Sequence, residues 1–481
     1  MIKYKPLLFL LLGVLSVLNV NAQIKLPALF SDNMMLQQKM EAPIWGWATK
    51  GETLFITTSW DSKTYEVKVD KHGAWKTKIK TPAFGGPYTI KIQQASEAIT
   101  IKNVLIGEVW LCSGQSNMEM PLKGFTGQSV RGGNEAIVHS RNNQIRFITV
   151  PRATVLEPKN DFEGHWQEAS PLTTGNFSAT AWYFGSLLQE VLNIPVGMVE
   201  VSYGGSNVEA WMNEEMLKDF ENTLPIPRNE TELKGAPNRK PTTLFNGMLS
   251  PVIGYGIKGA IWYQGESNRD RPFEYKDLFK KMVSSWRDLW NQGEFPFYFA
   301  QIAPFDYSVY HPNDNKEKYN SAYLREAQLQ ASKEIPNSAM AVLMDVGEKQ
   351  NIHPVNKEKG GQRLAYLALA KTYGMEGFEY ESPEFNAMEI KGSTVTVSFK
   401  NIPNGITTFG EESIGFEIAG ENKVFYPAQA VVRRKSVLLS SPRVEKPVAI
   451  RYLFKDFTKA EIFSAGGLPM SSFRTDNWYE E

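Results

Sequence analysis

Between about Asn103 and Tyr373, apolar strand-like runs alternate with amphipathic segments of helical length. The strand-like runs cover residues 104–112, 197–203, 256–263, 295–304 and 339–345, and the helical segments cover residues 179–193, 275–290, 321–335 and 360–374. This alternation predicts an α/β fold, in which a parallel sheet carries helices on both of its faces. In such a sheet, ligands and reactive groups gather beyond the carboxyl ends of the strands. The loops that follow the strand-like runs are therefore the places where functional residues are expected.

The segments on either side of this region have an all-β pattern. Four short alternating runs precede it and four follow it, each bounded by polar turn residues. We therefore expect an N-terminal β-sandwich domain over 23–102, an α/β domain over 103–380 and a C-terminal β-rich domain over 381–481. The polar, proline-containing stretch Arg228–Pro241 predicts a loop or flap inserted in the α/β domain.

The first 22 residues have the pattern of a signal peptide. Lys3 and Lys5 precede the apolar run Leu7–Leu18, and small residues follow up to Ala22. The apolar run is too short to span a bilayer comfortably. We therefore expect these residues to be removed on export, which would make the mature chain a secreted or periplasmic protein without a membrane span.

Composition narrows the classes of partner. The 52 basic residues are balanced by 52 acidic residues, which argues against nucleic acid or an anionic membrane surface as the main partner. Cys112 is the one cysteine, so neither an intrachain disulfide nor a multi-cysteine metal site can form. Twelve tryptophans could stack on sugar rings, although aromatic-rich cores are the commoner use of such residues.

Two of the loops after strand-like runs carry glycine beside a serine. Gly114-Gln115-Ser116 follows the run 104–112, and a serine exposed at a strand end can act as a nucleophile if a base lies beside it. Gly204-Gly205 follows the run 197–203, where glycine lets the backbone approach a ligand closely. Either motif alone is weak, because Gly-Ser and Gly-Gly turns are common.

Two further loops supply polar and titratable groups. After the run 256–263, Gln264 and Asn268 could donate hydrogen bonds, and Glu266 could orient a base. Asp345 closes the run 339–345, and His353 follows in the same loop. Of the five histidines, only His353 lies in a loop after a parallel strand with a carboxylate upstream. Because the four loops can meet at one edge of the sheet, their coincidence favours catalysis by a serine and a histidine.

Several sequence blocks resemble those of the sialate O-acetylesterase family, a carbohydrate-esterase branch of the SGNH hydrolases. The matching blocks are Gly-Gln-Ser-Asn-Met at 114–118, Gly-Gly-Ser at 204–206, Trp-Tyr-Gln-Gly-Glu-Ser-Asn at 262–268, Leu-Arg-Glu-Ala-Gln at 324–328 and Ile-His-Pro at 352–354. Matches near both ends, at 26–34 and 473–476, extend the similarity over nearly the whole mature chain. The resemblance implies an SGNH, flavodoxin-like three-layer domain with a parallel sheet.

The resemblance also implies a mechanism. Ser116 would attack an acetyl ester, with His353 as general base and then general acid. The oxyanion would be held by the backbone N–H groups of Ser116 and Gly205 and by a side-chain amide, which we place at Gln264. No metal or other cofactor is implied, because these hydrogen bonds hold the anionic intermediate.

One departure leaves the third member of the triad open. Many SGNH enzymes carry an acid three residues before the histidine, whereas this chain has Gln350 there. Either Asp345 or Glu266 would then orient His353, with Asp345 favoured because it shares the loop, or the pair would work as a dyad. Further candidates for substrate contacts are Asn117, Asn268 and Arg325.

The expected substrate is an acetylated sugar or glycan, most simply an acetylated sialic acid. A hemicellulose or acetyl-xylan esterase would use the same machinery, and the sequence does not separate the two. An arginine in the cleft would favour the carboxylate of a sialate, and Arg325 and Arg228 are the candidates. A non-catalytic glycan-binding protein is the alternative from another class. The oligomeric state is left open.

Overall fold

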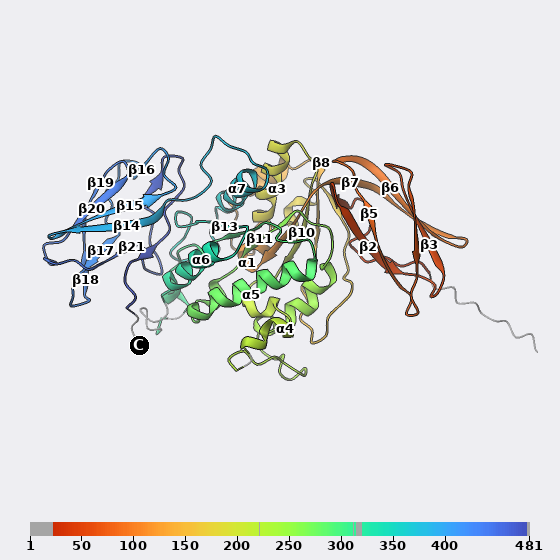
Figure 1. Cartoon of the computed structure of the whole chain (residues 1–481), viewed down its shortest axis with the longest axis horizontal. Coiled ribbons are helices and arrows are strands. Elements are labelled where there is room, and N and C mark those ends of the chain that lie inside the picture. The colour runs from red at the N-terminus through yellow and green to blue at the C-terminus, as the bar shows by residue number, and fades with distance from the viewer. Residues whose placement is uncertain (1–22, 221, 311, 314–319, 479–481) are drawn as a thin grey trace, which may run out of the picture.

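A computed structural model describes residues 23–478 except 221, 311 and 314–319 (Figure 1). The leader expected over residues 1–22 lies outside the described residues. Figure 1 shows an elongated molecule, with β-structure at both ends and an α/β region between them. No helix in the described part of the chain is long and apolar enough to cross a membrane.

The middle of the molecule is built on a mainly parallel sheet, which confirms the expected mixed α/β class. Its strands follow the order β13-β12-β11-β7-β10-β8-β9, and β9 alone runs antiparallel to its neighbour. The strands are β7 (Glu97–Gly114), β8 (Asn142–Thr149), β9 (Gln167–Ala169), β10 (Val196–Ser202), β11 (Gly259–Tyr263), β12 (Phe297–Ala300) and β13 (Ser338–Ala341).

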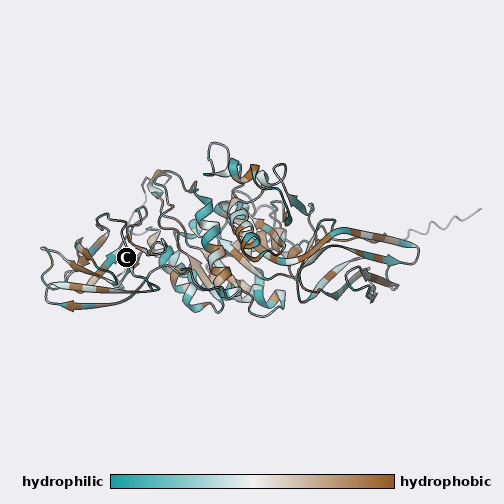
Figure 2. Ribbon diagram, turned by 90° about the horizontal axis from the view of Figure 1, so that it is seen from above, coloured by the Kyte–Doolittle hydropathy of each residue, from teal (hydrophilic) through white to brown (hydrophobic). Residues whose placement is uncertain are grey.

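Alternate side chains of β7 belong to two separate hydrophobic clusters. Val109 and Leu111 pack in a cluster with α5 and α6, whereas Trp110 and Cys112 pack in a cluster with α3 and α7. Burial on both sides explains why the strands read as continuous apolar runs, and Figure 2 shows hydrophobic residues concentrated in the central strands. The helices are α1 (Ser116–Glu119), α2 (Gly133–Val138), α3 (Ala179–Leu192), α4 (Glu214–Leu217), α5 (Pro272–Trp290), α6 (Ala322–Glu334) and α7 (Lys357–Leu367).

The N-terminal β-structure is continuous with the central sheet. The first half of β7 pairs with β6, and its second half pairs with β10 and β11. The expected boundary between residues 102 and 103 therefore falls inside one strand, because a single extended run serves both regions. The N-terminal strands are β1 (Met35–Gln37), β2 (Glu41–Trp47), β3 (Thr53–Thr58), β4 (Thr64–Lys68), β5 (Ala74–Lys80) and β6 (Gly85–Gln94).

The C-terminal region consists of small antiparallel sheets, as expected. One has the order β14-β15-β20-β19, another β18-β17-β21-β23, and β16 pairs with β22. The strands are β14 (Glu384–Lys391), β15 (Thr394–Lys400), β16 (Ile406–Thr407), β17 (Phe416–Ala419), β18 (Phe425–Pro427), β19 (Gln429–Val432), β20 (Ser436–Ser440), β21 (Ala449–Tyr452), β22 (Phe463–Ser464) and β23 (Phe473–Arg474).

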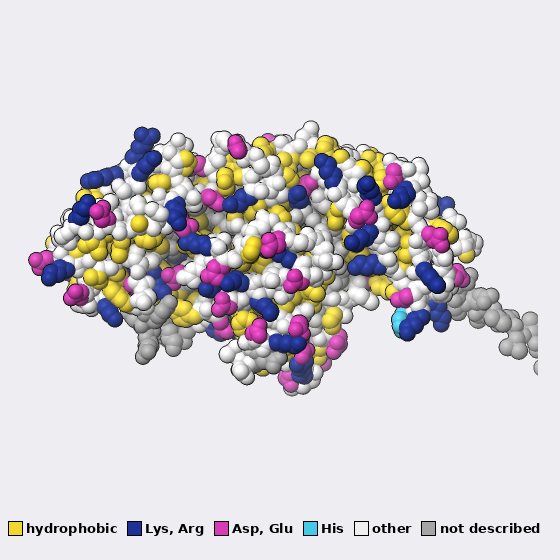
Figure 3. Space-filling view, in the orientation of Figure 1, with side chains coloured by type: hydrophobic (Ala, Val, Ile, Leu, Met, Phe, Trp, Pro, Cys, Tyr) yellow, Lys and Arg dark blue, Asp and Glu magenta, His cyan; other side chains and the backbone are white. Residues whose placement is uncertain are grey.

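Strand register places three loops at one level of the sheet. Gly114 at the end of β7 is opposite Ser202 of β10 on one side and Tyr263 of β11 on the other. The loops that carry Ser116, Gly205 and Glu266 therefore start together. On the face drawn in Figure 3, basic and acidic side chains are interspersed, in keeping with the zero formal net charge.

Candidate active site

Ser116 stands at the start of α1, two residues beyond the end of β7. Gly114 has φ +143°, and a Cβ there would lie 2.2 Å from the Tyr263 carbonyl oxygen. The next residue, Gln115, donates its backbone N–H to that same oxygen at 2.9 Å. Only glycine fits this close approach of β7 to β11, and the turn it allows lifts the Ser116 hydroxyl into the pocket.

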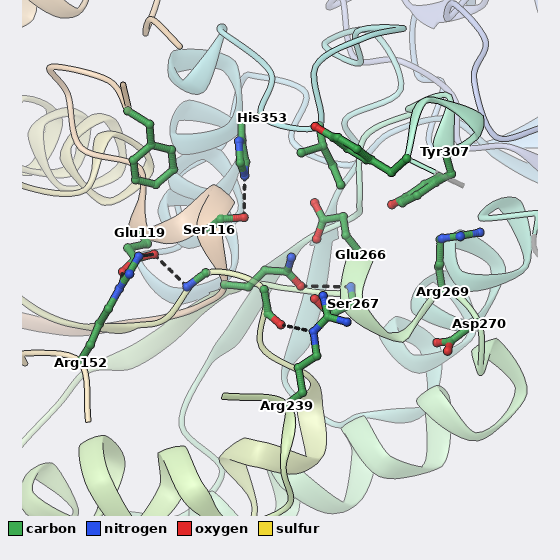
Figure 4. A pocket seen from close by; sticks show the side chains of 16 residues that line it. Ser116, Glu119, Arg152, Arg239, Glu266, Ser267, Arg269, Asp270, Tyr307 and His353 are labelled. Carbon is green, nitrogen blue, oxygen red and sulfur yellow. Dashed lines mark hydrogen bonds and ion pairs between the residues drawn. The ribbon is translucent and has the colours of Figure 1, made fainter. Parts of the chain in front are cut away.

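His353 meets the serine directly. Its Nε2 lies 2.8 Å from Ser116 Oγ, and Figure 4 shows this contact at the top of the pocket. The histidine comes from the loop after β13, which is separated from β7 by β12 and β11. The loop must cross both strands to reach the serine, so the two residues are brought together by the fold and not by local sequence.

The other ring nitrogen of His353 contacts an amide. Nδ1 lies 2.5 Å from Gln128 Oε1. An amide oxygen only accepts hydrogen bonds, so Nδ1 carries the proton and Nε2 is left to accept from the serine hydroxyl. Gln128 closes a turn in which its N–H donates to the Phe125 carbonyl at 2.9 Å, and the Phe125 ring packs edge-on to the imidazole with centroids 5.4 Å apart.

Burial holds the imidazole in its neutral form. Desolvation, together with the nearby cation of Lys357, lowers the pKa of His353 from its usual 6.5 to about 4. Neither direct neighbour of the ring, Ser116 or Gln128, bears a charge that would oppose this shift. The tautomer and the charge state are both those that a general base requires.

The structure places Asp345 away from His353, contrary to the sequence-based preference. Its carboxylate accepts from Arg363 at 2.6 and 2.8 Å and from Lys359 at 2.7 Å. Both cations lie on α7, and the bonds to Arg363 help to hold the pKa of Asp345 below its usual value against the effect of burial. Asp345 therefore anchors α7 to the end of β13, because a bidentate arginine binds it more strongly than an imidazole would.

Glu266, the alternative acid, lines the pocket but bonds to another residue. Its Oε1 accepts from Asn117 Nδ2 at 2.6 Å. Burial raises the pKa of Glu266, and its Oε2 has no hydrogen-bond partner among the described residues. With Ser116 and Gln128 occupying the two nitrogens of His353, no carboxylate completes a triad in this arrangement.

Gly205 borders the pocket in a left-handed conformation, with φ +70°. The inserted flap holds its loop from the other side. Asn238 Nδ2 donates to the Gly204 carbonyl at 2.8 Å, and Arg239 Nε donates to the Gly205 carbonyl at 3.2 Å. Because both carbonyls are turned toward the flap, the peptide groups of this loop have a fixed orientation beside Ser116.

Gln264 and Asn268 are fully buried and hold the loops together. Gln264 Nε2 donates to the Ser206 carbonyl at 3.0 Å and to Asn268 Oδ1 at 2.7 Å, and its Oε1 accepts from Tyr275 at 3.0 Å. Neither side chain borders the pocket. Gln115 does border it, with Oε1 fixed by the Gly265 N–H at 3.2 Å.

Arg325 is also buried, so it does not reach a substrate. It is 0% exposed, donates to Ser472 Oγ at 3.1 Å and also binds the Lys455 carbonyl. These contacts tie α6 to the C-terminal region. Arg228 is paired with Glu214 at the surface.

The pocket has a volume of about 810 Å³, and most of the residues that line it are polar or charged. Figure 4 shows Arg152 on one side and Tyr307 with Arg269 on the other, with Arg239 below the serine. Arg152 binds Glu119 at 2.6 Å, and Arg269 lies over the Tyr307 ring at 4.4 Å. Among the described residues, no cluster of three or more histidine, cysteine or acidic side chains is suited to hold a metal ion.

Sequence patterns missed four residues of this site. Gln128 lies in the loop before α2, Arg239 ends the short 3-10 helix Pro237–Arg239 of the flap, Gln115 stands between Gly114 and Ser116, and Lys357 lies in helix α7. The sequence offers a signal for one of them, since Gln115 belongs to the same strand-end motif as the serine.

The chain is similar to known carbohydrate esterases. Residues 106–370, more than half of the chain, match the family described as carbohydrate esterase, sialic acid-specific acetylesterase. The chain is 28% identical over 429 residues to the sialate O-acetylesterase of Mus musculus, covering 76% of this chain and 77% of that protein. It is also 28% identical over 385 residues to the Homo sapiens sialate O-acetylesterase, covering 73% and 72% respectively.

A solved structure gives the same result over a larger part of the chain. The crystal structure of a carbohydrate acetylesterase from Xanthomonas citri matches with a TM-score of 0.85 and 32% sequence identity, covering 95% of this chain and 100% of that one. The resemblance inferred from the sequence blocks is thus confirmed. The chain belongs to the sialic acid-specific acetylesterase family of carbohydrate esterases, and it is a carboxylic ester hydrolase.

Proposed function

We propose that this enzyme removes O-acetyl groups from sugars through an acyl-enzyme on Ser116, with His353 as general base and then general acid. The observation that carries the proposal is the 2.8 Å contact between Ser116 Oγ and an unprotonated Nε2. A hydroxyl at its free pKa is a weak nucleophile, and a base within hydrogen-bond reach removes that barrier. An intact pair of this kind also argues against the non-catalytic glycan-binding alternative.

The steps follow from the positions of the two residues. As Ser116 Oγ bonds to the acetyl carbon, its proton passes to His353 Nε2. The bond from the acetyl carbon to the sugar oxygen then breaks, and the imidazolium gives that oxygen its proton. Water repeats the sequence on the acetyl-serine, releasing acetate and restoring both residues.

The oxyanion is held by the backbone N–H groups of Ser116 and Gly205 and by the side-chain amide of Gln115. Gln115 replaces Gln264 in this role, because Gln264 spends both its amide N–H donors and its oxygen on buried partners. The Gln115 oxygen is fixed toward Gly265, which leaves its NH₂ group for the pocket that it borders. Such donors act on charge that develops only during the reaction.

A sugar, and not a long acyl chain, suits the rest of the pocket. Glu266 Oε2 and the Tyr307 hydroxyl are both buried, both belong to pocket-lining residues, and neither has a hydrogen-bond partner among the described residues. Most of the other residues that line the pocket also carry charged or hydroxyl groups, which can bond to the hydroxyls of a sugar. Leaving such groups unpaired is costly, so they favour a polyhydroxylated ligand.

An acetylated sialic acid is the favoured substrate, with hemicellulose acetyl groups as the second candidate. Three arginines and three acids line the pocket, so its overall charge does not decide between them. Arg239 favours sialate, since it makes no ion pair among the described residues and its side chain is exposed beside Gly205. Arginine binds carboxylates with two parallel hydrogen bonds.

The remaining parts of the proposal concern fold and location. We place the α/β region in the three-layer SGNH type and the active site at the carboxyl edge of its sheet. We also retain the signal peptide over residues 1–22, and with it a secreted or periplasmic location. Detection of the mature N-terminus near Gln23 in an exported fraction would test the latter.

Removing either reactive group should abolish turnover. We expect Ser116→Ala and His353→Ala each to lower kcat for an acetylated sugar by about 10⁴-fold or more, and the double variant to lose little beyond either single one, because the two act as a unit. Kinetics on p-nitrophenyl acetate and on acetylated sugars would check this. If the kcat losses of the two single variants multiplied in the double variant, the two residues would act independently, and the proposed proton transfer between them would be wrong.

The pH dependence should reflect the buried histidine. Activity needs neutral imidazole, so kcat/KM falls only as pH drops through the free enzyme's His353 pKa, which burial lowers to about 4. An acid limb near pH 6.5, the ordinary value for histidine, would mean that the imidazole is not desolvated in this way.

Gln128, and not Asp345, should matter for the chemistry of the histidine. Gln128→Leu removes the bond that selects the tautomer, and we expect kcat to fall by about 10- to 100-fold, the worth of one buried hydrogen bond. Asp345→Asn should instead lower the melting temperature, because it weakens the pairs with Arg363 and Lys359, while kcat of the folded enzyme stays within threefold. The opposite ranking would restore Asp345 as the orienting acid.

Variants of Gln115 and Gln264 should differ in the same way, the first in activity and the second in stability. Gln115→Met removes an oxyanion donor, and we expect kcat to fall by about 100-fold or more with little change in KM. Gln264→Met, the matched control, breaks buried bonds among the loops and should show mainly in thermal unfolding. A larger catalytic loss at Gln264, with stability unchanged, would return the oxyanion role to that residue.

A variant of Arg239 tests which of the two candidate substrates the pocket recognises. For Arg239→Gln, we expect KM for an acetylated sialic acid to rise by about tenfold, the worth of one charge-assisted contact, while KM for acetylated xylose stays within twofold. Steady-state kinetics on both esters would measure this. Equal changes on both substrates would exclude carboxylate recognition by Arg239 and favour a neutral glycan.

A further inference from the structure

Three buried side chains, one of which also lines the pocket, form a hydrogen-bonded chain that the reaction steps do not use. Lys357 Nζ donates to Asn117 Oδ1 at 2.6 Å, and Asn117 Nδ2 donates to Glu266 Oε1 at 2.6 Å. The three residues are 2%, 1% and 6% exposed, respectively. They come from α7, α1 and the short 3-10 helix Glu266–Asn268, so the chain joins three separate loops of the site.

The same chain holds the backbone on both sides of the histidine. Lys357 Nζ donates to the Pro354 carbonyl at 2.9 Å, and Asn117 Nδ2 donates to the Ile352 carbonyl at 3.2 Å. Asn117 is also the residue next to Ser116. The peptide groups that flank the base are therefore tied to the residue beside the nucleophile, and a displacement of about 1 Å at such a site can cost about 100-fold in rate.

A buried lysine would not be placed here for packing alone. Among the described residues, no carboxylate lies within ion-pair distance of Lys357, and burial lowers its pKa. The charges that oppose this shift are Glu266, reached through the Asn117 amide, and Glu348 of the His353 loop. The Asn117 amide thus bonds to both buried groups, and the attraction between the two opposite charges offsets part of the cost of burying each.

We propose that Lys357, Asn117 and Glu266 act as one positioning unit, which sets the His353 ring against Ser116 and holds a positive charge near it. This inference rests on the proposed Ser116–His353 chemistry. Since the orienting partner of His353 is the neutral Gln128, the position of the ring depends on how its backbone is held. Burial lowers the pKa of Lys357 to about 7, so it is a cation at the acid pH where His353 titrates. There it disfavours the imidazolium and lowers the pH at which the base becomes protonated.

Lys357→Met tests the unit, with p-nitrophenyl acetate as the probe. We expect kcat to fall by about 10- to 100-fold with KM within threefold, because a displaced base affects the reaction more than binding. The acid limb of kcat/KM should move to higher pH, because the cation that lowers the His353 pKa is gone. Lys359→Met is the matched control on the same helix, and its kinetics and pH profile should be those of the parent.

Two further variants separate positioning from general stability. Lys357→Gln keeps a donor without a charge, so it should shift the acid limb while losing less kcat than Lys357→Met. Asn117→Leu should lose about as much kcat as Lys357→Met but keep the acid limb of the parent, because the Lys357 cation is still present. The double variant should lose no more kcat than the worse single one. Circular dichroism and thermal unfolding would verify that each variant is folded.

The outcomes distinguish this inference from the proposed function. If the parent hydrolyses the probe and Ser116→Ala does not, the function stands. An unmoved acid limb in both Lys357 variants, with kcat within threefold, or losses that multiply in the double variant, would then overturn the positioning unit alone. A parent without esterase activity, or an active Ser116→Ala, would instead overturn the function on which the unit rests.

Discussion

Strand β7 pairs with β10 on one side and β11 on the other as far as Gly114, and the active site depends on this register. Because three parallel strands end together, the loops after them are forced to share one edge. The glycine allows β11 to approach closely and turns the chain so that Ser116 begins a helix at that edge. His353 is the one reactive group that must be brought from a distance, across two strands, and several contacts are devoted to holding it.

The electrostatic design of the site differs from that of a triad with an acid. His353 lies between a hydroxyl and an amide, so no anion next to the ring raises its pKa or stabilises its cation. Desolvation and the charge of Lys357 instead keep it neutral, and its orientation comes from hydrogen bonds to its side chain and to its flanking carbonyls. Such a base is weak, but it stays neutral down to a pH of about 4.

The fold class and the meeting of Ser116 with His353 could be predicted from the sequence, because periodicity sets the sheet and the motif residues stand in the loops after its strands. Apolar strands alternating with helices imply a parallel sheet, and loops such as those of Ser116 and His353 must then meet at one edge. Which side chain of a loop faces the pocket is decided by packing that no sequence pattern records. Gln264 and Asp345 turn toward buried partners, and Gln128 lies in a turn outside the pattern. The boundary expected at residue 102 falls inside β7, since one long strand can serve two regions.

The central claim is that the acetyl group passes through Ser116. Its most direct test is to mix the enzyme with an excess of acetylated sugar, stop the reaction in acid within the first turnover, digest the protein and determine by mass spectrometry where acetyl is attached. The account predicts that the peptide containing Ser116 gains the mass of one acetyl group, on that serine, and loses it once substrate is exhausted. Release of acetate through the first turnover with no acetyl on Ser116 at any time would contradict it.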